Sequence, residues 1–285
     1  MPEIPDLEVV RDFLNERLPG RRVAYAEAPV ASIIRSYAAE DFAGDVAGRT
    51  FGEVSRYGKD LYFPLDDDRL LVVNLMLTGR FHWSEASEAR PKRTFFLLGV
   101  GGHELRYTDE RHMGRIYYVR PGELTERVPA IAELGPDALD GGVSLDEFTE
   151  RLRAFTGEIK GILTRGKFLA GIGNAYADEV LFAAGVSPFT KRKELTPDDV
   201  HRLHEAVPRV LTEAREVVRE RMLPDIHKKV RDFLQVHRRG GEPCPSCGGA
   251  ISELTANQRI TSYCRRCQPG SLLRGVREHA AGRSA

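Results

Sequence analysis

The sequence predicts an α+β protein of two domains, and three observations carry that prediction. Apolar residues recur at helical spacing near the N-terminus and again in the second half, after residue 143. Between these regions, residues 22–120 contain β-branched and aromatic runs broken by Gly, Asp and Pro. All four cysteines lie within 24 positions near the C-terminus. We therefore expect a leading α-helix, an N-terminal β-sandwich, and a helical C-terminal domain that ends in a short cysteine hairpin.

The first half of the chain is divided by residues that end regular structure. A helix is expected from Asp6 to Leu18, where Pro19 and Gly20 interrupt the apolar pattern. Strands are then expected within residues 49–66, 69–83, 93–109 and 115–120. Residues 121–142 are rich in Pro, Gly and acidic side chains, which predicts a linker.

The second half has a period of about 3.6 residues, which is typical of amphipathic helices. Helices are expected at residues 144–155, 158–166, 174–185 and 196–222, and the helical pattern continues to about Gln235. We expect four parts: an N-terminal sandwich domain at 1–130, a helical domain at 131–238, a cysteine hairpin at 239–270 and a loosely ordered tail at 271–285.

The two halves of the chain carry opposite net charges, although the total net charge is zero. The net charge is zero, but residues 1–150 carry 18 basic and 27 acidic residues, and residues 151–285 carry 24 and 15. This asymmetry suggests either that the second half binds a polyanion or that two surfaces of opposite sign dock on each other. No apolar run approaches the ~20 residues of a membrane span, and no secretory signal precedes the first helix. The cytoplasm is the expected compartment.

The cysteines have the spacing of a metal site. They form two C-x2-C pairs separated by sixteen residues, comprising Cys244, Cys247, Cys264 and Cys267. Each pair is a tight turn that aims two thiolates at one point, and the intervening residues suit a hairpin. Two disulfides are the alternative, which a reducing cytosol disfavours. The pattern predicts one structural Zn2+ ion, with no open coordination position for catalysis.

The N-terminus is unusual because Pro2 and Glu3 directly follow Met1. Proline is small enough for Met1 to be removed, which leaves a secondary amine beside a carboxylate. An α-amine has a pKa near ~8, so a useful fraction is unprotonated at neutral pH. Such an amine can attack a sugar C1′ or a carbonyl carbon to form a Schiff base. The plain alternative is a start codon followed by a tolerated proline.

A glycine-rich turn lies between two expected helices. Gly171, Gly173 and Asn174 can let the backbone approach a ligand, and the N–H groups that open the next helix suit a phosphate. A tight packing turn is the alternative interpretation.

Three motifs together resemble one known family. "MPEIPDLE" at the start, "GIGNAYADEVLF" in the middle and "QRITSYCRRCQ" in the cysteine hairpin occur in the order found in the formamidopyrimidine-DNA glycosylase / endonuclease VIII family. The resemblance runs from Pro2 to Gln268. It implies a β-sandwich, a helix–two-turn–helix DNA-binding domain over residues 131–238, and a zinc hairpin. It also implies that a damaged nucleotide is flipped out of duplex DNA, because base chemistry inside the stack is inaccessible.

The resemblance also implies roles for single residues. Pro2 would be the nucleophile and Glu3 a general acid/base at the deoxyribose. Lys59 resembles a strand lysine that grips phosphate beside the lesion, although it could be a surface lysine in a hairpin. Asn174 would contact phosphate, and Arg259 at the hairpin tip would fork onto phosphates around the everted nucleotide.

Three further residues resemble the family's wedge, which fills the gap left by the flipped base. Leu77 stands where many members carry methionine, Arg111 would contact the orphaned base, and Met113 stands beside it in place of an aromatic residue. For Leu77 and Met113 the alternative is ordinary packing in the β-core.

The chain departs from the family pattern at the lesion pocket. Asp6 replaces a glutamate, Asn74 replaces a histidine, and residues 219–244 lack the glycine-rich loop that caps 8-oxoguanine in many members. The lesion pocket is therefore expected to be more open or built differently. Oxidised purines, ring-opened purines and oxidised pyrimidines all remain open as substrates.

The sequence thus predicts a bifunctional DNA glycosylase/AP lyase of base excision repair. Its partner would be double-stranded DNA with damaged bases, and it would act as a monomer in a bacterial-type cytoplasm, associated with the nucleoid. Three rivals remain: an enzyme directed mainly at abasic sites or another lesion class, a catalytically silent DNA-damage binder, and a zinc-ribbon module fused to an unrelated sandwich. Retention of both Pro2 and Glu3 argues against the silent binder, and the zinc-ribbon fusion would leave the N-terminal motif and Lys59 unexplained.

Overall fold

The computed structural model describes residues 1–140, 142–256 and 259–270, and the predicted tail at 271–285 lies outside them. The chain divides into two compact units. Unit 1 comprises residues 1–143, 164–173 and 208–233, and unit 2 comprises residues 144–163, 174–207 and 234–285. In the part of the chain that the structure describes, no helix is long and apolar enough to cross a membrane.

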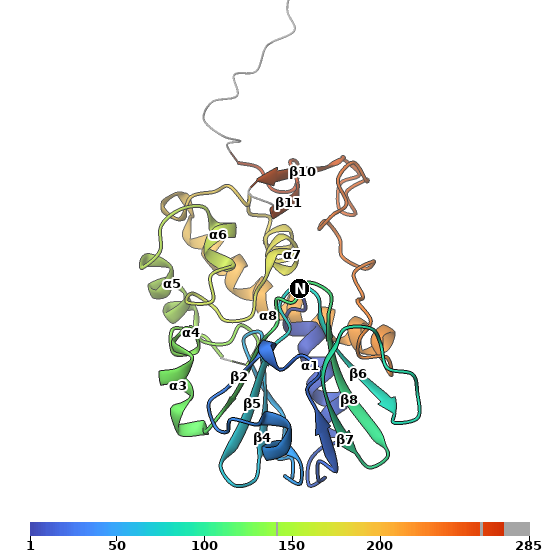
Figure 1. Ribbon diagram of the computed structural model, residues 1–285. Coiled ribbons are helices and arrows are strands. Elements are labelled where there is room, and N and C mark those ends of the chain that lie inside the picture. The colour runs from blue at the N-terminus through green and yellow to red at the C-terminus, as the bar shows by residue number, and fades with distance from the viewer. Residues whose placement is uncertain (141, 257–258, 271–285) are drawn as a thin grey trace, which may run out of the picture. The chain divides into compact units, whose positions relative to one another are not determined.

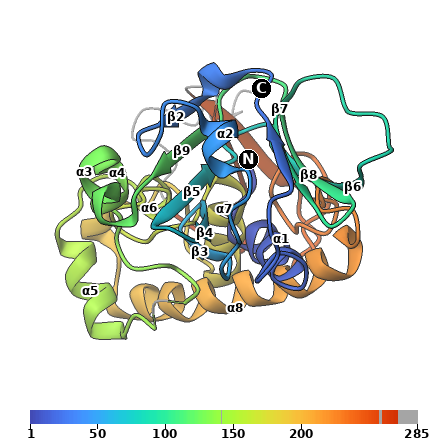
Figure 2. The ribbon, with the colours of Figure 1, turned by 60° about the horizontal axis from the view of Figure 1, so that its bottom comes forward.

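Unit 1 contains two sheets, as expected of a sandwich (Figure 1). The four-stranded sheet has the order β1-β7-β8-β6, formed by Tyr25–Glu27, Thr94–Val100, His103–Asp109 and Gly79–Glu85. The five-stranded sheet has the order β2-β9-β5-β4-β3, formed by Ile34–Ser36, Arg115–Val119, Arg69–Asn74, Asp60–Leu65 and Ser55–Tyr57. Figure 2 shows the strands of the second sheet side by side. The expected strands are confirmed, and all neighbours are antiparallel except the β2–β9 pair.

Aromatic side chains from both sheets fill the core of unit 1. Phe63 of β4 meets Phe81 of β6 edge-to-face at 5.5 Å between ring centroids, and Phe42 of helix α2 (Phe42–Val46) meets Tyr118 of β9 at 5.2 Å. Such edge-to-face pairs suit the ring quadrupoles. A 3-10 turn, η1 (Ala31–Ile33), precedes β2. This packed core fixes the strands, and with them the turns at the strand ends.

Helix α1 (Ile4–Asn15) starts and ends earlier than the expected Asp6–Leu18. Glu3 is its N-cap, and Pro5 lies in its first turn, where a missing N–H costs nothing. The helix ends at Asn15, whose side chain exchanges two hydrogen bonds with the backbone of Val54. Because α1 begins at Ile4, Pro2 and Glu3 lie directly before its first turn.

The predicted linker at 121–142 is more structured than expected. It contains the 3-10 turn η2 (Pro121–Glu123) and the short helices α3 (Leu124–Arg127) and α4 (Pro129–Ala132). Val128 lies between the two helices and packs on the outer face of the five-stranded sheet with Leu70 and Tyr117. Pro121 and Pro129 therefore stand in the first turns of η2 and α4, where a missing N–H costs nothing.

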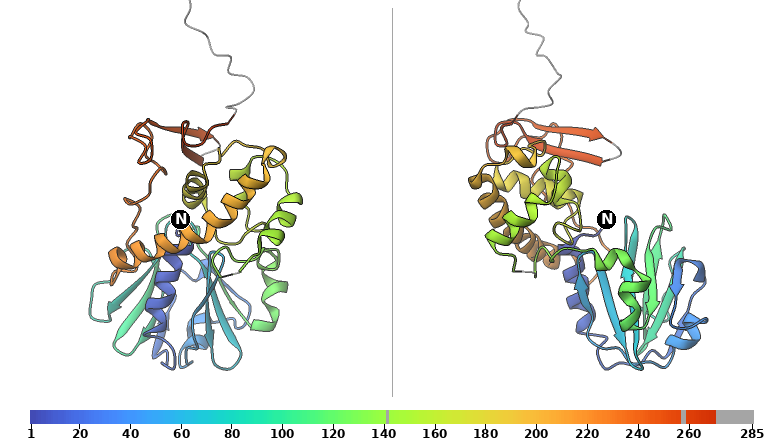
Figure 3. Two further views of the ribbon diagram at one scale, coloured as in Figure 1. Left: turned by 180° about the vertical axis from the view of Figure 1, so that it is seen from behind. Right: turned by 90° about the vertical axis from the view of Figure 1, so that its left-hand side faces the viewer.

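Unit 2 is helical and carries the cysteine hairpin. Its elements are α5 (Leu145–Arg153), α6 (Ile159–Leu163), α7 (Asn174–Ala184), η3 (Arg192–Glu194), the first part of α8 (Pro197–Met222), β10 (Ile251–Ala256) and β11 (Arg259–Cys264). Figure 3 shows α8 along its length. Ser144 caps α5 as expected, accepting a hydrogen bond from the Glu147 N–H at 3.2 Å.

The helical pattern was expected to continue to Gln235, and this expectation is wrong. Helix α8 ends at Met222, and Pro224, two residues later, has no N–H to extend the helix. Residues 223–233 then run as turns within unit 1, with Ile226 and Val230 buried in its core.

Candidate active site and metal centre

The N-terminal residues are buried and held at fixed positions. The Glu3 side chain is 3% exposed, and Pro2 is also buried. The Glu3 N–H donates to Asp6 Oδ2 at 2.8 Å, and the Gly173 N–H donates to Glu3 Oε2 at 2.8 Å. The second bond spans 170 residues of sequence and fixes the carboxylate next to the start of the chain. A carboxylate held in this way keeps one orientation for proton transfer.

The N-terminal residues leave no room for a side chain at either of the two glycines before α7. A Cβ on Gly171 would lie 2.3 Å from Ile4 Cδ1, and its φ of +103° favours glycine. A Cβ on Gly173 would lie 2.3 Å from Glu3 Cδ. From the sequence, these glycines were expected to let the backbone pass close to a ligand. In the structure they let the backbone pass close to Ile4 and Glu3, the two residues that follow Pro2.

A cationic cavity lies beside Pro2. It is lined by Met1, Pro2, Asp6, Val10, Leu75, Arg80, Met222, Ile226, Lys228, Lys229 and Arg231. Burial first, and then Lys229, lower the pKa of the Met1 α-amine to about 6 from an ordinary value of 8.0, while Glu3 opposes them. Cations disfavour a further positive charge on the amine. Burial and the neighbouring cations therefore favour the neutral form of the Met1 amine.

Lys59 lies in the two-residue turn between β3 and β4. Gly58 precedes Lys59 with a φ of +61°, and the Gly58 N–H donates to Asp137 Oδ2 at 2.8 Å. A Cβ on Gly171 would lie 3.2 Å from the Gly58 carbonyl oxygen as well as against Ile4. The backbone of the Lys59 turn and the Ile4 side chain thus both lie close to Gly171.

A buried arginine supports this turn. Arg56 is 0% exposed in its side chain and pairs with Glu8 of α1 at 2.5 Å, with Asp137 at 2.5 Å and with Asp140 at 2.8 Å. It also donates to the Gly58 carbonyl at 3.1 Å. Burial opposes the charge, but the bonds to Asp137 and Glu8 raise the pKa of Arg56 above its ordinary value. The group therefore stays cationic and ties α1 to the β3–β4 turn.

The three wedge candidates occupy two neighbouring turns of unit 1. Leu77 lies between β5 and β6, half-exposed and outside the buried core, whereas Arg111 and Met113 lie exposed between β8 and β9. Thr78 donates to Asp109 Oδ1 at 2.5 Å and accepts from the Arg111 N–H at 3.1 Å, which joins the turns. The structure therefore places these three residues on two turns linked by hydrogen bonds and does not place Leu77 or Met113 in the β-core.

Asn174 and Arg259 belong to unit 2. Asn174 opens α7, and its Nδ2 donates to the Ile260 carbonyl of β11 at 2.8 Å. Arg259 pairs with Ala256 in the β10–β11 register and is exposed at the end of the hairpin. Asn174 thus holds the strand that carries Arg259.

Further buried groups of unit 2 hold the same strand. Lys160 pairs with Asp178 at 2.7 Å and donates to the Ile260 carbonyl at 2.7 Å. Asp178 also accepts from the Ser262 N–H at 3.2 Å, and Glu179 accepts from three successive N–H groups at 235–237. Asp178 and Glu179 of α7 therefore anchor both sides of the cysteine hairpin.

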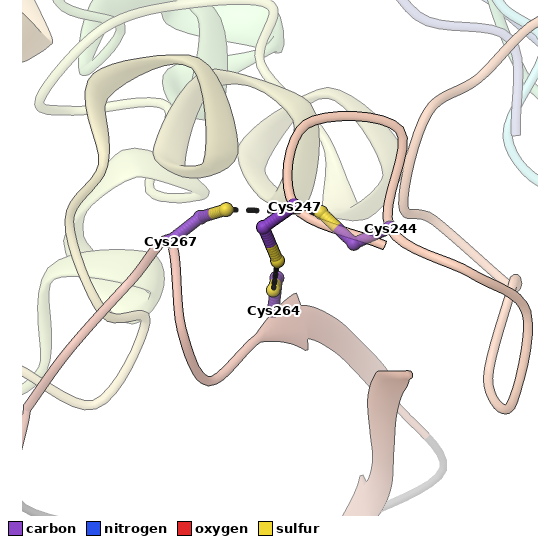
Figure 4. Close-up of side chains that lie close together, drawn as sticks. All are labelled: Cys244, Cys247, Cys264 and Cys267. Atoms are coloured by element: carbon purple, nitrogen blue, oxygen red, sulfur yellow. Dashed lines mark hydrogen bonds between the residues drawn. The ribbon is translucent and has the colours of Figure 1, made fainter. Parts of the chain in front are cut away.

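The four cysteines converge on one point (Figure 4). Their sulfurs all lie within 4.8 Å of one another, with Sγ–Sγ distances of 3.7 Å for Cys244–Cys267 and 3.5 Å for Cys247–Cys264. A disulfide requires about 2.05 Å, so the two disulfides are excluded. Tetrahedral zinc with Zn–S bonds of about 2.3 Å separates sulfurs by about 3.8 Å. The site fits one structural Zn2+ ion, as predicted.

Known proteins resemble this chain over most of its length. Family models match for the formamidopyrimidine-DNA glycosylase N-terminal domain at residues 1–116, the corresponding H2TH domain at 134–222, and the zinc finger found in FPG and IleRS at 241–270. A formamidopyrimidine-DNA glycosylase of Symbiobacterium thermophilum is 37% identical over 94% of this chain and 90% of its own. One of Desulfitobacterium hafniense is 34% identical, over 94% and 100%.

This chain belongs to the formamidopyrimidine-DNA glycosylase family. It is a DNA glycosylase of base excision repair, with a structural zinc finger. Among solved structures, a Lactococcus lactis FPG mutant in complex with Fapy-dG-containing DNA matches with a TM-score of 0.85 and 28% identity, over 94% of this chain and 100% of that one. The Lactococcus lactis enzyme in complex with abasic-site DNA matches with a TM-score of 0.85 and 27% identity, over the same shares.

Sequence reasoning missed several residues that position the site of this glycosylase. Arg56, Asp178 and Arg231 each have a hydrogen-bond partner that lies 59 to 225 residues away in the chain. For Asp178 the available signal was a charged residue inside an apolar stretch, which indicates a buried pair. Arg231 stands among other charged residues, so its sequence gave no such signal.

Proposed function

We propose that this glycosylase is bifunctional and also cleaves the DNA strand as an AP lyase. The observation that carries the proposal is the hydrogen bond from Gly173 N–H to the Glu3 carboxylate, which holds that carboxylate directly after the buried Pro2. A carboxylate next to an N-terminal amine provides a proton carrier and a nucleophile at one sugar.

In the proposed reaction, removal of Met1 frees the Pro2 amine. Its nitrogen lone pair attacks C1′ of the damaged nucleotide, the C1′–base bond breaks, and the base leaves with a proton. Glu3 protonates the ring oxygen as the sugar opens, which leaves a Schiff base between Pro2 and C1′. Proton loss from C2′ then eliminates the 3′ phosphate, and proton loss from C4′ eliminates the 5′ phosphate, which nicks the strand.

The other candidate residues would bind damaged double-stranded DNA. Lys59 would bind the phosphate beside the lesion, since its turn contacts the glycine that packs on the N-terminal helix. Asn174 and Arg259 would bind phosphates from unit 2, and Leu77, Arg111 and Met113 would fill the gap left by the flipped nucleotide. The zinc ion would keep Arg259 in place by fixing the hairpin.

The proposed division of labour follows the expected parts of the chain. Residues 1–130 would carry the chemistry, residues 131–238 would form the helix–two-turn–helix DNA-binding domain, and residues 239–270 would form the zinc hairpin. The enzyme would act as a monomer on oxidised or ring-opened purines, or on oxidised pyrimidines.

Borohydride trapping tests the chemistry. The protein is mixed with duplexes that carry an abasic site, 8-oxoguanine or thymine glycol, and covalent adducts are measured on a denaturing gel. We expect an adduct with wild type and none with Pro2→Gly, while Glu3→Gln should bind DNA but release little base. Failure to trap on all three duplexes would refute the lyase proposal. Trapping on the abasic duplex alone would favour an enzyme directed at abasic sites.

A further inference from the structure

The turn between β5 and β6 carries Leu77 and contains a rare backbone conformation. Met76, directly before Leu77, has a φ of +49°, a left-handed conformation that residues other than glycine seldom adopt. The Gly79 N–H closes the turn by donating to the Leu75 carbonyl at 2.9 Å. A strained conformation of this kind persists only when neighbouring groups hold it. The direction of Leu77 therefore depends on what holds Met76.

The side chain of Asn74 holds Met76 in this conformation. Asn74 Oδ1 accepts a hydrogen bond from the Met76 N–H at 3.0 Å, which is the local turn that asparagine forms with the backbone two residues on. Asn74 Nδ2 donates to Asp60 Oδ1 at 2.9 Å. Because the N–H needs an acceptor and the carboxylate needs a donor, the two bonds fix which way the amide faces. Loss of the bond to Asp60 would let the amide turn away from Met76.

Asp60 connects this turn to the turn of Lys59. It is the first residue of β4, directly after Lys59, and it stands opposite Asn74 in the β4–β5 register. Opposite residues of an antiparallel pair point to the same face, so the register itself brings the two side chains together. Asp60 is 9% exposed, and a buried carboxylate is costly unless it accepts a hydrogen bond. Asp60 and Asn74 therefore stabilise each other at the ends of neighbouring strands.

Hydrogen bonds continue from the same turn to the turn between β8 and β9. Thr78 donates to Asp109 Oδ1, and Asp109 Oδ2 accepts the Met113 N–H at 2.8 Å. All of these residues belong to unit 1. A continuous path of hydrogen bonds and neighbouring residues thus links the turn of Lys59, the turn of Leu77 and the turn that carries Met113.

We propose that Asp60 and Asn74 are positioning residues, which hold Leu77 at a fixed place relative to Lys59 so that the damaged nucleotide can be extruded. Asn74 acts through the backbone of Met76, and Asp60 acts through Asn74, so neither side chain needs to touch DNA. The inference rests on the proposed function, in which Leu77 fills the gap left by the flipped nucleotide.

The test compares two reactions of the same protein. A paired base must be unstacked and unpaired before it is released, whereas an abasic nucleotide has no base to extrude. A misplaced Leu77 should therefore slow base release more than abasic-site cleavage, while partial loss of folding slows both. The measured quantity is the single-turnover rate of base release, divided by the rate of strand cleavage at an abasic site. The lesion is 8-oxoguanine or thymine glycol, whichever wild type releases faster.

Three variants of the pair make the test specific. Asn74→Ala and Asp60→Ala should each lower the ratio about tenfold, because each leaves a buried polar group without its partner. Asp60→Asn keeps an oxygen for the Asn74 amide and should retain the wild-type ratio within threefold. The double variant Asn74→Ala/Leu77→Ala should resemble Leu77→Ala alone, since Asn74 acts through Leu77.

Asn15→Ala is the matched control. Asn15 also exchanges two hydrogen bonds with the backbone, at Val54, but it lies at the end of β3 away from the Lys59 turn. This variant should lower the thermal unfolding midpoint as Asn74→Ala does and leave the ratio unchanged. If Asp60→Ala does not fold, Asn74→Ala and its double variant with Leu77→Ala carry the test.

A second measurement needs no chemistry. The probe is a duplex with 2-aminopurine, whose fluorescence reports stacking, opposite a tetrahydrofuran abasic-site analogue. Saturating wild type should change its emission, and saturating Asn74→Ala should produce less than half of that change. Wild type that leaves the emission unchanged would overturn the proposal, because Leu77 would then fill no gap.

The proposal is also overturned if Asn74→Ala keeps both the ratio within threefold and the full emission change, or if its effect on the ratio adds to that of Leu77→Ala. A wild-type protein that forms no borohydride adduct at an abasic site would instead refute the lyase chemistry. The emission measurement would then decide the positioning role, so the two failures are distinguishable.

Discussion

Gly173→Ala should disable the glycosylase by displacing Glu3. The added Cβ would lie 2.3 Å from the Glu3 carboxylate carbon, where ordinary contact begins at 3.4 Å, so the carboxylate must move by about 1 Å. Misplacement of a catalytic group by that distance costs about 100-fold in rate. The hydrogen bond from the residue 173 N–H would also weaken, lowering the free energy of unfolding by about 1–2 kcal/mol.

The assay is single-turnover base release, followed by thermal unfolding of the same preparations. Gly161→Ala is the matched control, since a Cβ there meets open space on helix α6 and should raise stability by up to about 1 kcal/mol. Gly171→Ala is a second comparison: its φ of +103° and the contact with Ile4 predict mainly a loss of stability. A folded Gly173→Ala protein that releases base within threefold of wild type would refute the role of Glu3.

Three other outcomes are expected. In protein that keeps Met1, Lys229→Met should raise the pKa of the Met1 α-amine, because the neighbouring cation lowers it; the pH at which an acylating reagent modifies this amine should shift upward, and an unchanged pH dependence would contradict the contribution of Lys229. Cys247→Ser should reduce zinc content and weaken DNA binding, and unchanged values of both would contradict the structural role of zinc. Burial first, then His227, lowers the pKa of His82 to about 4, so the unfolded chain binds a proton first; the free energy of unfolding should fall as pH drops from about 6.5 towards 4, and His82→Gln should flatten that dependence in urea titrations.

The fold was largely predictable because its signals are local. β-Branched and aromatic runs broken by Gly, Asp and Pro indicated the strands, and the C-x2-C spacing indicated the metal site. The start of α1 at Ile4 was missed because a proline in the first turn resembles a helix breaker as much as an N-terminal residue. Similarly, the stretch after Met222 kept an apolar spacing although Pro224 ends the helix.

The candidate site was predictable only in part. The identity of Pro2, Glu3 and the cysteines follows from motifs, but what holds them does not. The Gly173–Glu3 bond spans 170 residues and the Arg231–Asp6 pair spans 225. A charged residue in a loop has the same local sequence whether it is solvated or paired across the fold, so only the structure identifies these partners.

The space around Gly171 and Gly173 has a consequence for comparing related chains. Neither position has room for a side chain while Ile4 and Glu3 occupy their present places. Glycine is therefore needed at both positions because the N-terminal residues, distant in sequence, lie against this turn. A relative whose terminus is displaced or lost would regain room for larger residues there. Larger residues at the positions of Gly171 and Gly173 in such a relative would then indicate an altered N-terminus, even where its first residues are unknown.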